Sequence, residues 1–122
     1  LQCGDVFDAK AGRLIGAQTI VVDAGRITAL RPGKAEVPGA TVIDLAGHTC
    51  SPGWIDLHVH VGQESNPNSY SEGFRLDDVD FALRATLYTR RTVEAGFTSV
   101  RDLGGEIAPH LRDAINAGTI PG

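Results

Sequence analysis

Residues 54–61 limit the possible folds of this chain more than any other segment. They read Trp-Ile-Asp-Leu-His-Val-His-Val and are apolar on both faces apart from one aspartate and two histidines. A strand that is buried on both faces is typical of a parallel sheet. A polar loop, a helical pattern, a second buried strand and a second helical pattern follow, at residues 62–75, 78–95, 97–102 and 106–117. This order predicts an α/β fold with a parallel sheet and right-handed crossovers.

The helix predicted for residues 78–95 has a clear beginning, a clear end and one apolar stripe. Asp77 or Asp78 can cap its first turn, and Gly96 can adopt the left-handed conformation that follows many helices. Phe81 and Tyr88 lie together on a separate side. There they either pack against a neighbouring helix of the same fold or form a subunit contact. The stripe comprises Val79, Ala82, Leu83, Thr86, Leu87 and Val93.

Residues 1–50 have a different character, with short β-branched runs separated by Gly and Pro turns. Strands are predicted at residues 1–8, 19–23, 26–30 and 40–45. The tripeptide Asp23-Ala-Gly25 lies between two of these runs and predicts a hairpin. These short strands indicate part of a small β-sandwich or sheet. The change of character at Pro52-Gly53 divides the chain into two predicted domains, residues 1–52 and residues 53–122.

The composition excludes several classes of protein. The chain has 122 residues, of which 42% are hydrophobic, and a net charge of −4, which suits one small core. No basic cluster predicts nucleic-acid binding, and no apolar run is long enough for a membrane span. Cys3 and Cys50 are far apart and lack metal-type spacing, so buried free thiols are the favoured interpretation.

We interpret the sequence as a segment of a longer chain, because Leu1 lies inside a strand pattern and residues 119–122 read as a loop. The two cysteines do not settle the redox compartment. Both a cytoplasmic and an exported location are therefore compatible with the sequence.

Two histidines one residue apart form a candidate metal site. Alternate side chains of a strand share a face, so His58 and His60 point the same way, together with Asp56. The histidines lie at the carboxyl end of the first buried strand, and Asp102 holds the matching place on the second. Active sites of α/β barrels gather at this edge. Two solvent-facing histidines on an edge strand are the alternative, but the position favours a divalent metal such as Zn²⁺.

Residues 47–60, Gly-His-Thr-Cys-Ser-Pro-Gly-Trp-Ile-Asp-Leu-His-Val-His, resemble the opening signature of the amidohydrolase superfamily. Residues 92–105, Thr-Val-Glu-Ala-Gly-Phe-Thr-Ser-Val-Arg-Asp-Leu-Gly-Gly, resemble the second-strand region of its imidazolonepropionase-like branch. That branch includes Xaa-Pro dipeptidases and ochratoxinase-like amidases. The resemblance implies that residues 53–122 start a metal-dependent (β/α)8 TIM barrel. It also implies that residues 1–52 are the N-terminal part of a small β-sandwich domain.

The resemblance assigns His58 and His60 as ligands of one or two divalent ions, most simply Zn²⁺. It places Asp56 beside them, where it orients an imidazole. In the family, a carboxylated lysine, two further histidines and a proton-transferring aspartate come from later strands, so no catalytic residue is expected in this segment. The other histidines and the lysines of the first domain are expected to be structural or exposed: His48, His110, Lys10 and Lys34.

The function implied by the resemblance is hydrolysis of an amide or peptide bond by metal-activated water, in a dipeptide or an N-acyl amino acid. This activity belongs to the full-length parent chain, since a barrel of this type needs about 250 residues. The alternatives are an imidazolonepropionase-type cyclic amidase, a deaminase, a non-catalytic family member and a small β-module that binds a partner.

The expected partners are a small-molecule amide or dipeptide substrate, the remainder of the protein's own chain and further copies in a homo-oligomer. Neither nucleic acid nor a membrane is expected. Long loops in compact domains are often functional, so the polar loop at residues 62–75 is expected to form part of a pocket wall. Its candidate substrate contacts are Asn68, Tyr70 and Arg75.

Overall fold

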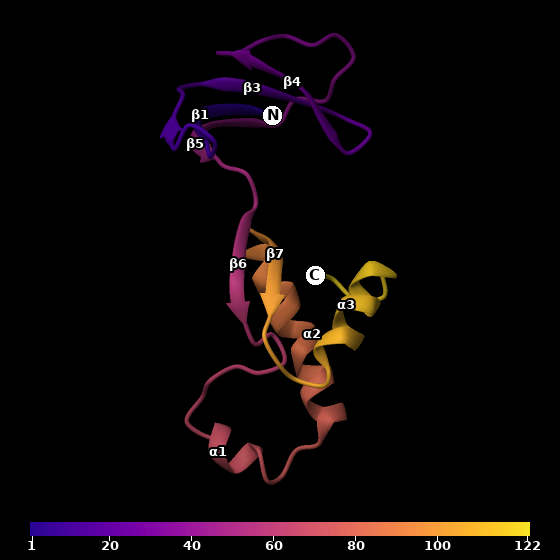
Figure 1. Ribbon diagram of the computed structural model, residues 1–122. Helices are drawn as coiled ribbons and strands as arrows, with labels where there is room; N and C mark the ends of the chain where they lie inside the picture. Colours follow the sequence, from indigo (N-terminus) through magenta and orange to yellow (C-terminus); the bar gives the residue numbers. More distant parts are fainter. The chain divides into compact units, whose positions relative to one another are not determined.

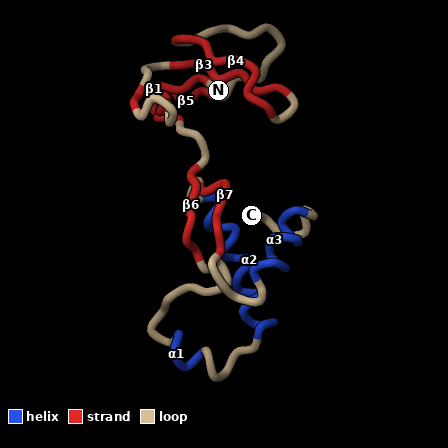
Figure 2. Tube along the Cα trace, in the orientation of Figure 1, coloured by secondary structure: helices blue, strands red, loops and turns tan.

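The computed structural model describes all of residues 1–122, which fall into two compact units. Leu1–Pro52, the strand unit, contains only β-strands (Figure 1). Gly53–Gly122, the mixed unit, combines strands and helices (Figure 2). The chain is therefore a mixed α/β segment, as the order of its sequence patterns predicts.

The strand unit is built around β1 (Gln2–Asp8), which pairs with three other strands. It runs antiparallel to β2 (Arg13–Leu14) and β3 (Gln18–Asp23), and parallel to β5 (Asp44–Cys50). β4 (Arg26–Pro32) extends the sheet beyond β3, with which it pairs antiparallel. The order of this sheet therefore depends on β1.

The hairpin predicted at residues 23–25 is confirmed. Asp23 pairs with Arg26, and the two residues between them, Ala24 and Gly25, have positive φ angles of 46° and 74°. Two positive φ angles in a two-residue turn match the twist of the flanking antiparallel strands. Gly25 adopts this conformation at no steric cost because it has no Cβ atom.

The strand predicted for residues 40–45 is displaced along the chain, because β5 begins at Asp44 and continues to Cys50. The β-branched residues before Asp44 lie outside the strand, although the carbonyl of Ile43 accepts a hydrogen bond of 2.9 Å from the Gln2 amide. The parallel register, which aligns Gln2 with Asp44, determines where β5 starts. Pairing with β1 therefore overrides the local β-propensity.

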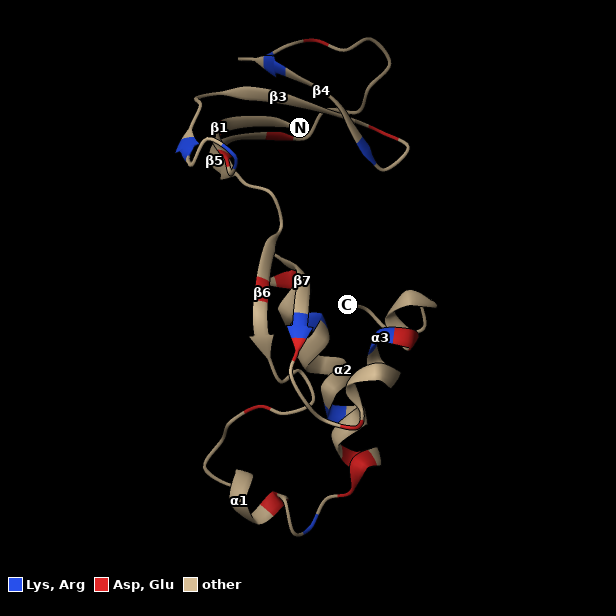
Figure 3. Cartoon of the chain, viewed as in Figure 1, with Lys and Arg blue, Asp and Glu red and all other residues tan.

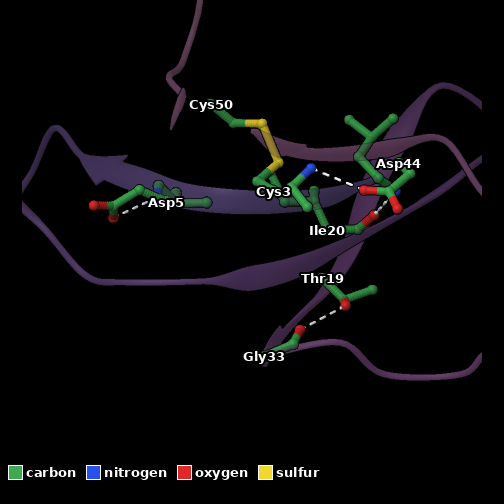
Figure 4. The surroundings of a disulfide bond; sticks show 10 residues. Cys3, Asp5, Thr19, Ile20, Gly33, Asp44 and Cys50 are labelled. Atoms are coloured by element: carbon green, nitrogen blue, oxygen red, sulfur yellow. Dashed lines mark hydrogen bonds between the residues drawn. A yellow bond between two sulfur atoms is a disulfide. The ribbon is translucent and has the colours of Figure 1, made fainter. Parts of the chain in front are cut away.

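Cys3 and Cys50 form a disulfide, so the prediction of two buried free thiols is wrong (Figure 4). Cys3 lies in β1 and Cys50 ends β5, and the parallel pairing of these strands brings their Cα atoms within 6.0 Å. Cys3 is buried in the strand unit. The two cysteines are 47 residues apart in sequence, and only the pairing of the strands makes them neighbours.

The mixed unit contains one parallel pair of strands, β6 (Trp54–Val59) and β7 (Phe97–Asp102). Between them the chain forms a short helix, α1 (Ser69–Glu72), and a long helix, α2 (Asp78–Glu94). A third helix, α3 (Ala108–Asn116), follows β7, and α2 packs against both β7 and α3. The β-loop-α-β-α order is as predicted, with α1 added inside the loop.

The Pro-Gly turn before β6 sets the spacing between the two strands. A Cβ atom at Gly53 would collide with the side chain of Thr98 in β7. The next residue, Trp54, donates its amide hydrogen to the Gly96 carbonyl at 2.8 Å. Its indole ring also packs against Phe97, with ring centroids 6.4 Å apart. Glycine is therefore required where β6 approaches β7.

Both ends of α2 are confirmed. The Asp77 side chain accepts hydrogen bonds from the amides of Val79 and Asp80 at 2.9 and 3.1 Å. The Asp80 side chain accepts in return from the Asp77 amide, which completes a capping box. Gly96, just after the helix, has a φ angle of 97°. Asp77, rather than Asp78, is thus the N-cap.

The buried face of α2 differs from the predicted stripe. Ala85 and Thr89 are its buried residues, and Phe81 and Tyr88 are half-buried on the same side. Phe81 and Tyr88 thus lie on the packed side of α2 within the mixed unit, and the subunit contact stays a prediction. Three residues of the predicted stripe are exposed instead: Val79, Leu83 and Leu87. The small Ala85 and Thr89 side chains permit close approach, so packing rather than hydrophobicity selects the face.

Acidic and basic side chains are scattered over both units, and α2 carries both signs (Figure 3). Several form exposed ion pairs, among them Arg90 with Glu94 at 2.8 Å and Lys34 with Asp44 at 3.0 Å. Exposed pairs of this kind contribute little to folding stability. No helix of the chain has the length and apolar character needed to cross a membrane.

Breaking the disulfide is expected to destabilise the strand unit by about 4 kcal/mol, because the bridge restricts the unfolded chain across a loop of 47 residues. Denaturant unfolding with and without reductant measures this difference. The variant carrying both Cys3→Ser and Cys50→Ser is the control. Its stability should match that of the reduced protein and should not change when reductant is added. Equal unfolding midpoints for the oxidised and reduced protein would contradict the expectation.

Candidate functional site

The two predicted metal ligands lie together at the end of β6. His58 belongs to the strand, and His60 follows its last residue, Val59. Their imidazole rings have centroids 5.5 Å apart and meet edge to face, with an angle of 74° between their planes. The His60 side chain is 56% exposed, so it is accessible to a ligand from solvent.

The spacing of the two rings fits a shared metal ion. At a Zn–N distance of about 2.1 Å, two imidazoles on one tetrahedral ion have ring centres about 5 Å apart. The observed 5.5 Å between His58 and His60 is close to this value. The chain holds no group of three or more His, Cys, Asp or Glu side chains that could surround an ion. The donors present therefore fit two positions of a coordination sphere and do not complete it.

Asp102 lies beside His60 at the end of β7. Its Oδ1 atom is 4.0 Å from Nδ1 of His60, and its side chain is only 12% exposed. The Val61 amide donates to Oδ2 at 2.9 Å, and the Gly104 amide donates to Oδ1 at the same distance. Parallel pairing aligns Asp102 with Val59, so this carboxylate connects the carboxyl ends of the two strands.

The sequence placed Asp102 at the position on the second strand that matches the histidines, but gave it no role. The feature of the sequence that points to Asp102 is its place at the carboxyl end of a predicted buried strand, directly before Leu103-Gly-Gly105. The contact itself depends on the register of β6 and β7, which shifts twice along the pair.

Asp56 makes a different contact from the one expected. Its Oδ1 atom accepts a hydrogen bond of 3.0 Å from the backbone amide of His58, two residues further along β6. The side chain is thus engaged by its own strand rather than by an imidazole ring. Asp56 is half-buried. Its role in orienting a metal ligand stays a prediction.

The loop after His60 is attached to α2 by two ion pairs. The Arg84 guanidinium contacts a Glu72 carboxylate oxygen at 2.9 Å, and Arg91 contacts Glu64 at 3.3 Å. The other Glu72 oxygen accepts a hydrogen bond of 3.0 Å from the Asn66 side-chain amide. Glu72 therefore joins the turn at Asn66, the end of α1 and the middle of α2.

Glu72 is one of the two carboxylates that link the loop to the helix. The Asn66 side-chain amide, followed by the Arg84 guanidinium, holds the pKa of the Glu72 carboxyl below its usual range. A carboxyl with a lowered pKa stabilises the folded protein above its unfolded pKa, and this contribution is lost as the pH falls through the folded pKa. The contribution of Glu72 to the attachment is therefore present at neutral pH and is lost in acid.

The predicted substrate contacts lie in or beside α1. Tyr70 is 84% exposed and packs edge to face against Phe74, with ring centroids 5.1 Å apart. Asn68 precedes α1 without a side-chain capping hydrogen bond, and Arg75 follows the helix. Neither these two residues nor Tyr70 lines the two cavities of about 340 and 310 Å³ that include His60. The structure thus does not bring them to the histidine pair.

The residues expected to be structural or exposed are placed as follows. His110 is exposed on α3, and His48 is exposed on β5. Lys34 pairs with Asp44 at 3.0 Å, and Lys10 is exposed in the turn after β1. The Ala46 amide and then Lys34 hold the pKa of the Asp44 carboxyl below its usual range.

No family model matches the chain, but individual proteins do. A dihydroorotase of Pelotomaculum thermopropionicum is 34% identical over 99 residues, which are 80% of this chain and 19% of that protein. An allantoinase of Streptomyces avermitilis is 45% identical over 56 residues, which are 45% of this chain and 12% of that protein. The chain thus spans about a fifth or less of the length of these curated relatives.

Solved structures match nearly the whole chain. A Xaa-Pro dipeptidase with methionine bound in its active site is similar with a TM-score of 0.90 and 33% identity, over 99% of this chain and 30% of that one. A prolidase complexed with N-methylphosphonate-L-proline is similar with a TM-score of 0.80 and 35% identity, over 99% of this chain and 29% of that one. The ochratoxinase of A. niger is similar with a TM-score of 0.68 and 25% identity, over 99% of this chain and 28% of that one. The likeness covers both units of this chain.

Replacing Glu72 with Gln is expected to loosen residues 62–77 without unfolding α2, because the variant removes the carboxylate that holds the loop on Arg84. Hydrogen–deuterium exchange at pH 7 should be faster for the loop amides and unchanged for the middle of α2. Glu94→Gln is the matched control, since it removes an Arg–Glu pair that lies within the helix. Identical exchange of the loop in the Glu72 variant and the wild type would refute the attachment.

Proposed function

Because this chain belongs to the amidohydrolase superfamily, as its N-terminal portion, we propose that the full-length protein is a metal-dependent hydrolase of amide bonds. The observation that carries the proposal is the similarity to the Xaa-Pro dipeptidase, with a TM-score of 0.90 over 99% of the chain. The favoured substrate is a dipeptide, in which proline can be the second residue, or an N-acyl amino acid. The likeness to the prolidase and to ochratoxinase supports the same class of activity.

The mixed unit is assigned as the first two βα units of a (β/α)8 TIM barrel. The parallel pairing of β6 with β7, connected through α2, supports this assignment. The strand unit is assigned as part of a small β-sandwich domain. In such barrels, the groups that act on the substrate lie at the carboxyl ends of the strands, where His58, His60 and Asp102 are found.

His58 and His60 are the residues that would hold the metal, most simply one or two Zn²⁺ ions. When bound, such an ion lowers the pKa of a water molecule and polarises the substrate carbonyl. Each imidazole would bind the ion through an unprotonated ring nitrogen. The other ligands and the proton-transferring group are assigned to the rest of the parent chain.

The loop of residues 62–77 contributes to the site by position. It starts directly after the histidine pair and is attached to α2 through Glu64 and Glu72. A loop fixed at both points can form a stable wall beside the metal and exclude water from the bound substrate.

A second candidate function is the hydrolysis of a cyclic amide. The similarity to a dihydroorotase and an allantoinase favours it, because dihydroorotate and allantoin both contain ring amides. A panel of Xaa-Pro dipeptides, N-acyl amino acids and cyclic ureides separates the two candidates in one experiment. Release of a free amino acid supports the first, and ring opening without a second product supports the other. Ammonia release would indicate a deaminase.

Replacing both His58 and His60 with Ala in the full-length protein is expected to remove bound metal and reduce amide hydrolysis below detection. Metal content per chain by mass spectrometry and product formation from the substrate panel are the two measurements. His110→Ala is the matched control, since it removes an exposed imidazole from α3 and should change neither quantity. Full metal content and unchanged turnover in the double variant would refute the assignment of His58 and His60 as metal ligands.

A further inference from the structure

We propose that Asp102 is a positioning residue for His60, holding the Nδ1 side of the imidazole so that Nε2 is presented to the metal. The proposal rests on the proposed function, because it takes His60 as a metal ligand. It adds a carboxylate from β7 to a site that is otherwise built at the end of β6.

The first support is the fixed position of the carboxylate. One backbone amide donates to each oxygen at 2.9 Å, from Gly104 to Oδ1 and from Val61 to Oδ2. The two amides belong to the segments that follow β7 and β6, so the carboxylate is held from both strands. With 12% of its side chain exposed, Asp102 has little freedom to turn away.

The second support is the remaining acceptor capacity of Oδ1. A carboxylate oxygen can accept two hydrogen bonds, and only the Gly104 amide occupies Oδ1. Nδ1 of His60 lies 4.0 Å from Oδ1. This separation is longer than a hydrogen bond, so the structure shows proximity of the two groups and no bond between them. It nevertheless places the carboxylate on the Nδ1 side of the ring.

The third support is the close approach of the loop after β7 to the same ring. A Cβ atom at Gly104 would lie 3.8 Å from Cε1 and 4.0 Å from Nδ1 of His60. A side chain at position 104 would therefore contact the imidazole on the side where Asp102 lies. Asp102 and Gly104 both lie on the Nδ1 side of the ring, so Nε2 is the nitrogen on the side away from them.

The arrangement matches the usual environment of a histidine that binds a metal. Histidines that bind metals usually donate their second ring N–H to a carboxylate or a carbonyl, which fixes the tautomer and raises the basicity of the ligating nitrogen. Asp56 makes no comparable approach to an imidazole, and its Oδ1 atom accepts a hydrogen bond from the backbone amide of His58. Within this chain, Asp102 is the carboxylate that lies within 4.0 Å of a histidine ring nitrogen.

The alternative is a purely structural role, in which Asp102 only connects the ends of β6 and β7 through the two backbone amides. Both roles predict that loss of the carboxylate disturbs the protein. They differ in whether the effect on metal binding passes through His60. A double-mutant cycle separates them, because two residues that act as one unit have non-additive effects.

The test measures Zn²⁺ affinity by chelator competition in the full-length wild type, Asp102→Asn, His60→Ala and the double variant. We expect Asp102→Asn to weaken Zn²⁺ binding by about 10- to 100-fold. In the His60→Ala background, the same change should have no further effect. Asp113→Asn removes an exposed carboxylate from α3 and is the matched control, with wild-type affinity expected.

Two results would overturn the positioning role. One is wild-type Zn²⁺ affinity in Asp102→Asn. The other is an equal loss of affinity in both backgrounds, which makes Asp102 a structural residue or an independent ligand. Failure of the proposed function has a different signature, since His60→Ala itself would then bind Zn²⁺ as tightly as the wild type.

A second measurement needs no variant and decides the question if Asp102→Asn does not fold. ¹⁵N spectra of histidine-labelled, Zn²⁺-loaded wild type, with His60 identified by its absence in His60→Ala, report which ring nitrogen carries the proton. The proposal requires a protonated Nδ1 and a metal-bound Nε2. A metal-bound Nδ1 with a protonated Nε2 contradicts it.

Discussion

The parallel pairing of β6 with β7 is the constraint on which the candidate site depends. The two strands are separated in sequence by a loop and two helices, yet Val59 lies opposite Asp102 at their carboxyl ends. Gly53 permits their close approach at the other end, where Thr98 leaves no room for a side chain. The distance between a histidine on one strand and a carboxylate on the other therefore follows from backbone pairing.

Much of the mixed unit could be predicted from sequence because its signals are local. The capping box at Asp77 and the glycine at position 96 mark the ends of α2, and strand alternation together with the family signature singled out His58 and His60. The buried face of α2 was not predictable from hydrophobicity, because the side that packs is formed by the small residues Ala85 and Thr89.

The features missed from sequence are those set by pairing between distant segments. The contact of Asp102 with His60 depends on two register shifts between β6 and β7, which no local pattern encodes. The Cys3–Cys50 disulfide depends likewise on the parallel alignment of β1 with β5. In both cases the sequence shows which residues are present, but their contact follows only from the register of the paired strands.

The arrangement of β1 also has a consequence for how the strand unit is made during translation. The β3–β4 hairpin joins adjacent residues and can form as soon as they leave the ribosome. β1 is synthesised earlier, but its parallel partner β5 emerges about 40 residues later, and non-local pairing of this kind is slow. One edge of β1 therefore stays open while the hairpin is already folded. A nascent chain that stalls in this interval presents an unpaired strand, which is the type of surface that recruits chaperones or aggregates.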